Sequence, residues 1–160
     1  MINAHLALTS TIDKKEERCR QEFLPHLKLI KGLDVFLEKL KSKNVPLGIG
    51  TAAPVHNVDF VLDNLRLAHY FKAIIGPADV TESKPHPEVF LKAASQLGVQ
   101  PERCVVFEDS PKGVEAASRA GMKAIGVTSY HQPGELKSKD LLFTIEDYTD
   151  ERLAGLFGLS

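Results

Sequence analysis

Short apolar runs and amphipathic segments alternate along the chain from Gly32 onward. The short runs predict buried strands, whereas apolar residues that recur every three or four positions predict helices. The predicted strands cover 45–51, 72–76, 103–109, 122–129 and 141–145, and the predicted helices cover 32–43, 55–65, 86–98, 111–121 and 150–157. Because the strands are apolar throughout, helices should cover both faces of a parallel sheet, which predicts an α/β fold with three Rossmann-like layers.

Residues 1–31 follow a different pattern from the rest of the chain. Residues 11–30 predict a charged amphipathic helix that breaks near Pro25, because proline lacks the backbone N–H that a helix interior needs. We therefore expect an appended helix and hinge within residues 1–31, followed by an α/β core over residues 32–160.

The composition narrows the range of partners. The chain has 20 basic and 21 acidic residues, so no basic excess favours nucleic acid. Its apolar runs are too short to cross a bilayer, and its N-terminal residues lack the pattern of a signal peptide. Cys19 and Cys104 share no metal-ligand spacing and are expected to be reduced packing thiols. These features predict a cytoplasmic protein that binds neither membranes nor nucleic acid.

Four polar side chains follow predicted strands in the core. Thr51 ends one strand, Lys84 lies in the loop after the next, and Glu108 and Asp109 end the third. Because ligands bind at the carboxyl ends of parallel strands, these side chains should share one edge of the sheet. A hydroxyl, an ammonium and two carboxylates suit a phosphoryl group and Mg²⁺, which prefers oxygen ligands.

Each of these residues also has a structural interpretation. A threonine such as Thr51 often serves a turn, and a loop lysine such as Lys84 is often solvated. Asn57 could add an amide to the site, but a solvated helix residue is the simpler interpretation. Asp109 or Ser110 could cap the helix that opens at residue 111. The sequence alone leaves these alternatives open.

Three strings of the chain resemble a known family when they are taken in order. "GIGTAA", "SKPHPEVF" and "VVFEDSPKGVEAASRAGM" resemble the second, third and fourth motifs of the haloacid dehalogenase superfamily. The nearest resemblance is to its β-phosphoglucomutase-like phosphatases and mutases, and it covers about residues 24–127. It implies a Mg²⁺-dependent phosphatase or phosphomutase that acts on small sugar phosphates through an aspartyl-phosphate. The implied residues are Thr51 and Lys84 for catalysis, Thr51, Ala52, Asn57 and Lys84 for phosphate binding, and Glu108 and Asp109 for the metal.

One motif of this family has no counterpart in the sequence. The family's nucleophile is the first Asp of an Asp-x-Asp motif that ends its first strand, and that strand lies between those of Thr51 and Glu108. The nearest acids, Asp13 and Asp34, fall in helical patterns. We therefore expect a family core without its first strand and with most of its cap missing, residues 1–31 being a remnant of cap and hinge. Such a chain should be inactive by itself.

Other expectations follow from the missing strand. Residues 4–11 could pair into the central gap, or two chains could exchange elements as a homo-oligomer. The chain could also be a non-catalytic phosphate- or metal-binding module, or one half of a split enzyme. A receiver-type signalling domain also carries acids, Thr and Lys at strand ends, but there the acids come first, and here they come last.

Overall fold

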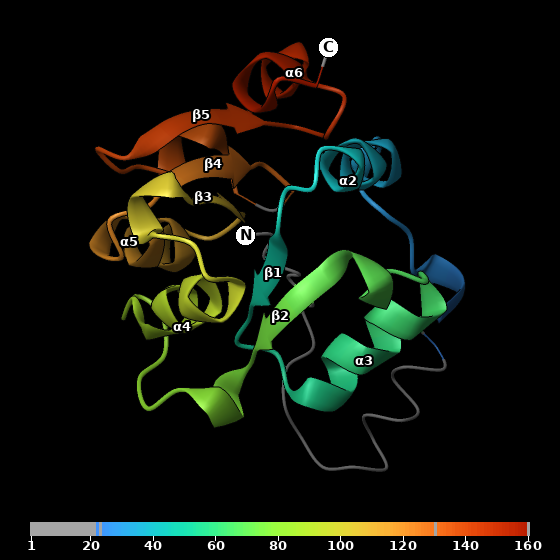
Figure 1. Ribbon diagram of the computed structural model, residues 1–160, viewed down its shortest axis with the longest axis horizontal. Helices are drawn as coiled ribbons and strands as arrows, with labels where there is room; N and C mark the ends of the chain where they lie inside the picture. The colour runs from blue at the N-terminus through green and yellow to red at the C-terminus, as the bar shows by residue number, and fades with distance from the viewer. Residues whose placement is uncertain (1–21, 23, 130, 160) are drawn as a thin grey trace.

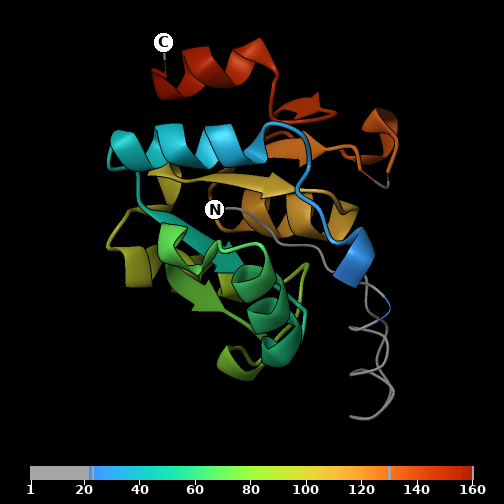
Figure 2. The same cartoon turned by 90° about the vertical axis from the view of Figure 1, so that its right-hand side faces the viewer.

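The computed structural model describes residues 22, 24–129 and 131–159 and shows an α/β fold of parallel strands between helices (Figures 1 and 2). The strands are β1 (Leu47–Gly50), β2 (Phe71–Ile75), β3 (Val105–Glu108), β4 (Lys123–Val127) and β5 (Leu141–Ile145). The helices are α2 (Leu33–Ser42), α3 (Val55–Asn64), α4 (Glu88–Leu97), α5 (Pro111–Arg119) and α6 (Glu151–Phe157). Short 3₁₀ turns lie at Leu24–His26, Ala68–Tyr70, Pro77–Asp79, Pro101–Arg103 and Pro133–Glu135. The predicted fold class and the predicted elements of the core are confirmed.

Among the described residues, the strand pairings form two parallel groups, one of two strands and one of three, which we call the two sheets. β1 pairs with β2, and β3, β4 and β5 follow one another in the second sheet. Across the described residues, no backbone ladder joins β1 to β3. We call the boundary between these two strands the seam. Every observed pairing is parallel, so within each sheet the carboxyl ends of the strands lie at one edge.

Two hydrophobic cores lie on opposite faces of the strands. Side chains of α2, α3 and α6 pack in one core, whereas α4 and α5 pack in the other, as the separation of these helices in Figure 1 shows. The second core contains many alanines, so its helices approach the strands closely. A Cβ atom on Gly50 of β1 would lie 3.0 Å from the Phe90 ring of α4, which explains the small residue at this position. This close packing sets the loop after β2 beside the end of β1.

Burial differs between inner and outer strands. All four residues of β1 are buried, but the outer strands β2 and β5 are only partly covered. The expectation of buried strands therefore holds only in part for β2 and β5, along whose outer edges no further strand pairs within residues 24–129 and 131–159. Val55, the first residue of α3, is 64% exposed.

The N-terminal expectations lie mostly outside the described residues. Only a 3₁₀ turn at Leu24–His26 falls near the predicted helix break at Pro25. In the part of the chain that is described, no helix has both the length and the apolar character needed to cross a membrane.

The turn between β3 and α5 places an acid under the start of a helix. Ser110 is the N-cap, since its hydroxyl accepts a hydrogen bond from the Gly113 N–H at 3.1 Å. The Glu108 side chain fills the space beside Gly113, where a Cβ would lie only 1.9 Å from the carboxylate carbon. Of the two predicted capping residues, Ser110 performs the role, and glycine at position 113 makes room for Glu108.

Phe36 connects the elements of the first core. The centre of its ring lies 5.5 Å from the ring centres of Phe107 and Tyr148 and 5.6 Å from that of Phe157. Replacing Phe36 with alanine should lower the free energy of unfolding by about 3–5 kcal/mol because it leaves a cavity. Val35→Ala is the control: this neighbour is 55% exposed, so its effect should stay within about 0.5 kcal/mol. Urea denaturation measures both, and equal effects would contradict this account of the core.

Gly113→Ala should displace the Glu108 carboxylate and lower the free energy of unfolding by about 1–3 kcal/mol. The matched control is Gly155→Ala in α6, where an added Cβ meets nothing within 4 Å. That change should stabilise the protein by about 0.5–1 kcal/mol, because alanine favours a helix over glycine. Urea titration of the two variants checks the contrast, and a Gly113→Ala protein as stable as wild type would disprove it.

Candidate active site

Lys84 lies at the seam and contacts both sheets. Its Nζ lies 2.5 Å from Oε1 of Glu108, the last residue of β3. The same ammonium donates a hydrogen bond to the carbonyl oxygen of Gly50, the last residue of β1, at 3.2 Å. It also lies 4.7 Å from the centre of the Phe90 ring. The side chain is only 10% exposed, so the alternative of a solvated loop lysine is wrong.

Glu108 is fully buried and is held from several directions. Its Oε2 accepts hydrogen bonds from the backbone N–H groups of Asp109 and Ser110 and from the Ser110 hydroxyl, at 3.0–3.2 Å. Oε1 faces Lys84. A buried carboxylate needs a counter-charge and hydrogen-bond donors to offset the loss of water, and both are present here. Glu108 therefore fixes the ammonium of Lys84 and the turn that carries Asp109.

Asp109 is the second buried carboxylate, with 7% of its surface exposed. It follows Glu108 directly and does not cap α5, because Ser110 does. Burial raises the pKa of Tyr148, and the negative charge of Asp109 raises it further. The Asp109 carboxylate therefore lies near enough to Tyr148, a residue of the first core, for its charge to act on the phenol group.

Thr51 and Lys84 line one hollow of about 190 Å³. Ala52 lies in its wall as well, together with Pro77 and residues 80–84. The Thr51 hydroxyl accepts a hydrogen bond from the Ala53 N–H at 3.0 Å, so the turn interpretation of this residue is correct. A hydroxyl can accept one hydrogen bond and donate another.

Asn57 is buried in the first turn of α3, with 1% of its surface exposed. The interpretation as a solvated helix residue is therefore wrong. Asn57, Glu108 and Asp109 are not among the described residues that line the hollow of Thr51 and Lys84. The structure thus joins Thr51, Ala52 and Lys84 around one hollow, and Lys84 links that hollow to the acids of β3.

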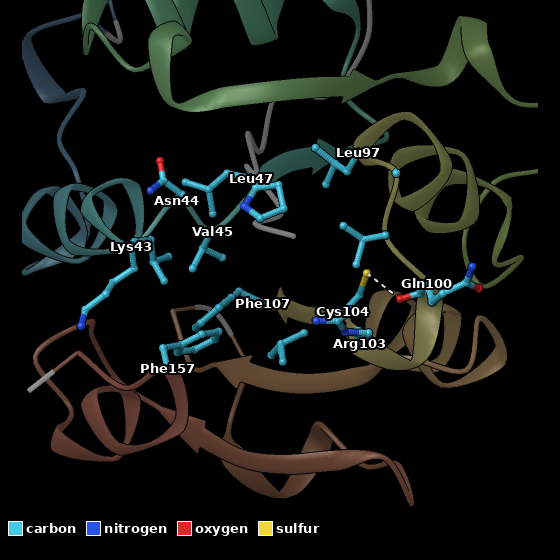
Figure 3. Close-up of a pocket in the computed structure, with 15 residues that line it drawn as sticks. Lys43, Asn44, Val45, Leu47, Leu97, Gln100, Arg103, Cys104, Phe107 and Phe157 are labelled. Carbon is cyan, nitrogen blue, oxygen red and sulfur yellow. Dashed lines mark hydrogen bonds between the residues drawn. The ribbon is translucent and has the colours of Figure 1, made fainter.

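A second hollow, of about 450 Å³, lies at the other end of the seam. In Figure 3, Val45 and Leu47 on the β1 side lie across it from Cys104 and Phe107 on the β3 side. The Cys104 thiol is buried, which raises its pKa, and its Sγ donates to the Gln100 carbonyl at 3.5 Å. The predicted packing role of this cysteine agrees with its burial, whereas Cys19 lies outside the described residues. The walls of this hollow are mainly apolar, so it differs in character from the hollow beside Lys84.

Sequence reasoning missed Glu88, the first residue of α4. Its Oε2 accepts hydrogen bonds from the Thr81 N–H, the Thr81 hydroxyl and the Glu82 N–H, at 2.8–3.1 Å. The ion pair with Lys92, followed by these hydrogen bonds, lowers the pKa of Glu88 to about 2. An acid in the first turn of a helix can be recognised in the sequence. The hydrogen bonds that Glu88 accepts from a loop six or seven residues earlier can be seen only in the folded structure.

The donor set fits Mg²⁺. Over the described residues, no group of three or more His, Cys, Asp or Glu side chains could hold a metal. Mg²⁺ usually binds through only one or two protein carboxylates and keeps several waters, so an adjacent buried pair is sufficient. Glu108 and Asp109 are the residues that would hold the ion.

Comparison with known proteins gives consistent results. A family model for haloacid dehalogenase-like hydrolases matches residues 3–127. Validoxylamine A 7′-phosphate phosphatase from Streptomyces hygroscopicus subsp. limoneus is 34% identical over 129 residues, which cover 81% of this chain and 60% of that protein. The chain thus spans less than two thirds of the length of this relative.

Solved structures show the same likeness. A family IA, variant 3 HAD hydrolase from Entamoeba histolytica superposes with a TM-score of 0.79 at 30% identity, over 91% of this chain and 68% of that one. The β-phosphoglucomutase of Clostridium difficile shares the fold, with a TM-score of 0.74 at 24% identity over 91% of this chain and 65% of that one. Because the family model covers most of the sequence and the fold agrees, this chain belongs to the haloacid dehalogenase-like hydrolases.

Proposed function

We propose that this chain provides the phosphoryl-binding part of a phosphatase or phosphomutase that acts on small sugar phosphates. The observation that carries the proposal is the Lys84 ammonium, held between the ends of β1 and β3 beside the hollow that contains Thr51. The relative from Streptomyces, a phosphatase of a phosphorylated metabolite, supports the substrate class.

Lys84 and Thr51 have the hydrogen-bonding capacity for this role. An ammonium has three N–H donors, and two of those of Lys84 are used by Gly50 and Glu108. The third can bind a phosphoryl oxygen and offset its negative charge. Thr51 and Ala52 line the same hollow, and we propose that they contact the bound anion there.

Glu108 and Asp109 complete the site on the β3 side. Mg²⁺ bound to these carboxylates would neutralise charge on the phosphoryl oxygens. Glu108 would then have two tasks, since it also fixes Lys84. We propose Mg²⁺ as the cofactor because two adjacent buried acids next to an anion-binding lysine suit a hard divalent cation.

Binding of inorganic phosphate, measured by isothermal titration calorimetry, tests this site. Lys84→Met should weaken phosphate binding at least about tenfold, because a charged hydrogen bond is lost, whereas Lys84→Arg should retain most of the affinity. Lys72→Met, at an exposed lysine of β2, is the control and should bind like wild type. Asp109→Asn should weaken Mg²⁺ binding measured in the absence of phosphate. Equal phosphate affinities for the methionine variants of Lys84 and Lys72 would refute the site.

The second proposal concerns the attacking group. The 160 residues contain no Asp-x-Asp motif, and binding groups cannot replace a nucleophile. We propose that the chain acts as one part of a complete enzyme, with a strand carrying the nucleophile entering the seam. The 450 Å³ hollow, whose mainly apolar walls come from residues beside both β1 and β3, favours this proposal. The expectation that residues 4–11 fill the seam lies outside the described residues.

Phosphate release from p-nitrophenyl phosphate with Mg²⁺ checks this second proposal. The 160-residue chain alone should show no release above the buffer rate. Addition of a separate peptide, an apolar strand that ends in Asp-x-Asp, should produce turnover that Asp109→Asn abolishes in the longer chain. Rapid release by the 160-residue chain alone, sensitive to Asp109→Asn, would show that the nucleophile is already present.

A further inference from the structure

The loop that carries Lys84 is fastened to α4 by one carboxylate. Oε2 of Glu88 accepts from the Thr81 N–H at 2.9 Å, the Thr81 hydroxyl at 2.8 Å and the Glu82 N–H at 3.1 Å. Thr81 and Glu82 come three and two residues before Lys84, so these bonds fix the backbone from which the lysine extends. Hydrogen bonds to an ionised acceptor are stronger than those between neutral groups.

A second set of contacts extends this fastening. Oε1 of Glu88 lies 2.7 Å from Nζ of Lys92, one turn further along α4. The same ammonium donates to the Asp79 carbonyl at 2.5 Å, and the Asp79 carboxylate accepts from the Gly76 N–H at 2.8 Å. The chain is thus held at Gly76, at Asp79 and at Thr81–Glu82. This clamp, made of Glu88, Lys92 and Asp79, spans the loop from the end of β2 to Lys84.

The clamped loop is a wall of the phosphate hollow. Pro77, Val80 and the segment from Thr81 to Lys84 line the 190 Å³ hollow opposite Thr51. Glu88 is not one of the lining residues, so it acts on the hollow from behind the loop. The Glu88 side chain is 16% exposed and accepts three hydrogen bonds through one oxygen, so the contact rests on several donors that act together.

We propose that Glu88 is a positioning residue, which holds the Thr81–Lys84 backbone so that the Lys84 ammonium stays between Gly50, Glu108 and the bound anion. The assignment rests on the proposed function of Lys84. Without the carboxylate, the Thr81 and Glu82 N–H groups lose their acceptor, and the loop that forms the wall of the hollow is no longer tied to α4. Loss of the Glu88 carboxylate should therefore weaken anion binding at the hollow more than it lowers the free energy of unfolding.

The experiment compares Glu88→Ala and Glu88→Gln with Glu115→Gln. Glu115 pairs with Arg119 one turn along α5, so its variant removes the same kind of helical ion pair without touching the loop. Two quantities are measured: the acetylation rate of Lys84 by acetic anhydride, followed by mass spectrometry, and the affinity for sulfate, which mimics a phosphoryl group. Lys123, paired with Asp140, serves as an internal reference for acetylation. Thermal unfolding shows that each variant is folded.

In the Glu88→Ala variant, acetic anhydride should acetylate Lys84 at least about threefold faster than in wild type. The variant should also bind sulfate about tenfold more weakly than wild type, because charge-assisted hydrogen bonds are lost. Glu88→Gln should show a smaller change, because its amide oxygen still accepts from Thr81 and Glu82. Glu115→Gln should match wild type in both measurements. Wild-type acetylation and sulfate binding in both folded Glu88 variants would overturn the assignment.

The two proposals fail in different ways. If wild type binds neither sulfate nor phosphate, the proposed function fails, and the acetylation rate of Lys84 alone decides whether Glu88 holds the loop. A different result refutes only the positioning role: Lys84→Met loses sulfate binding, whereas Glu88→Ala keeps both the sulfate affinity and the Lys84 acetylation rate of wild type.

Discussion

The ion pair between Lys84 and Glu108 is the interaction on which the site depends. In the described residues β1 and β3 share no backbone ladder, yet one ammonium reaches the carbonyl of Gly50 at the end of β1 and the carboxylate of Glu108 at the end of β3. A buried pair of this kind contributes little net stability, because desolvation offsets the attraction. Its value is positional, since neither charge can leave without exposing the other to an apolar interior.

Each partner of the pair is held by its own surroundings. Glu108 occupies the space that the missing side chain of Gly113 leaves. Its carboxylate accepts hydrogen bonds from the backbone N–H and the hydroxyl of Ser110, at the start of α5. Lys84 extends from a loop that α4 grips through Glu88, and it lies over the ring of Phe90. Helices α4 and α5 belong to the same alanine-rich core, so their packing sets the distance between the two charges. The chemistry at the strand ends is thus determined by packing on one face of the sheets.

The two ends of the seam have opposite character. Charged and polar groups gather at the carboxyl ends of the strands, where Lys84 bridges the sheets. The other end is an apolar hollow between Leu47 and Phe107 (Figure 3). Apolar walls favour an apolar occupant, and a polar rim favours a strand that ends in a charged residue. This polarity along the seam agrees with the proposal that the chain works as part of a larger phosphoryl-transfer enzyme.

The sequence by itself determined the elements and the residues with functional chemistry. Periodicity, the glycine stop at Gly98 and the Ser-Pro start of α5 are local signals, so strands, helices and the Thr51, Lys84 and Glu108 motifs could be predicted. Only the tertiary structure decided which groups touch. The burial of Asn57, the hydrogen bonds from Glu88 to the Lys84 loop and the ion pair of Lys84 with Glu108 depend on contacts between segments that are separated in the sequence. No local pattern encodes such contacts, because they arise from how helices pack against strands.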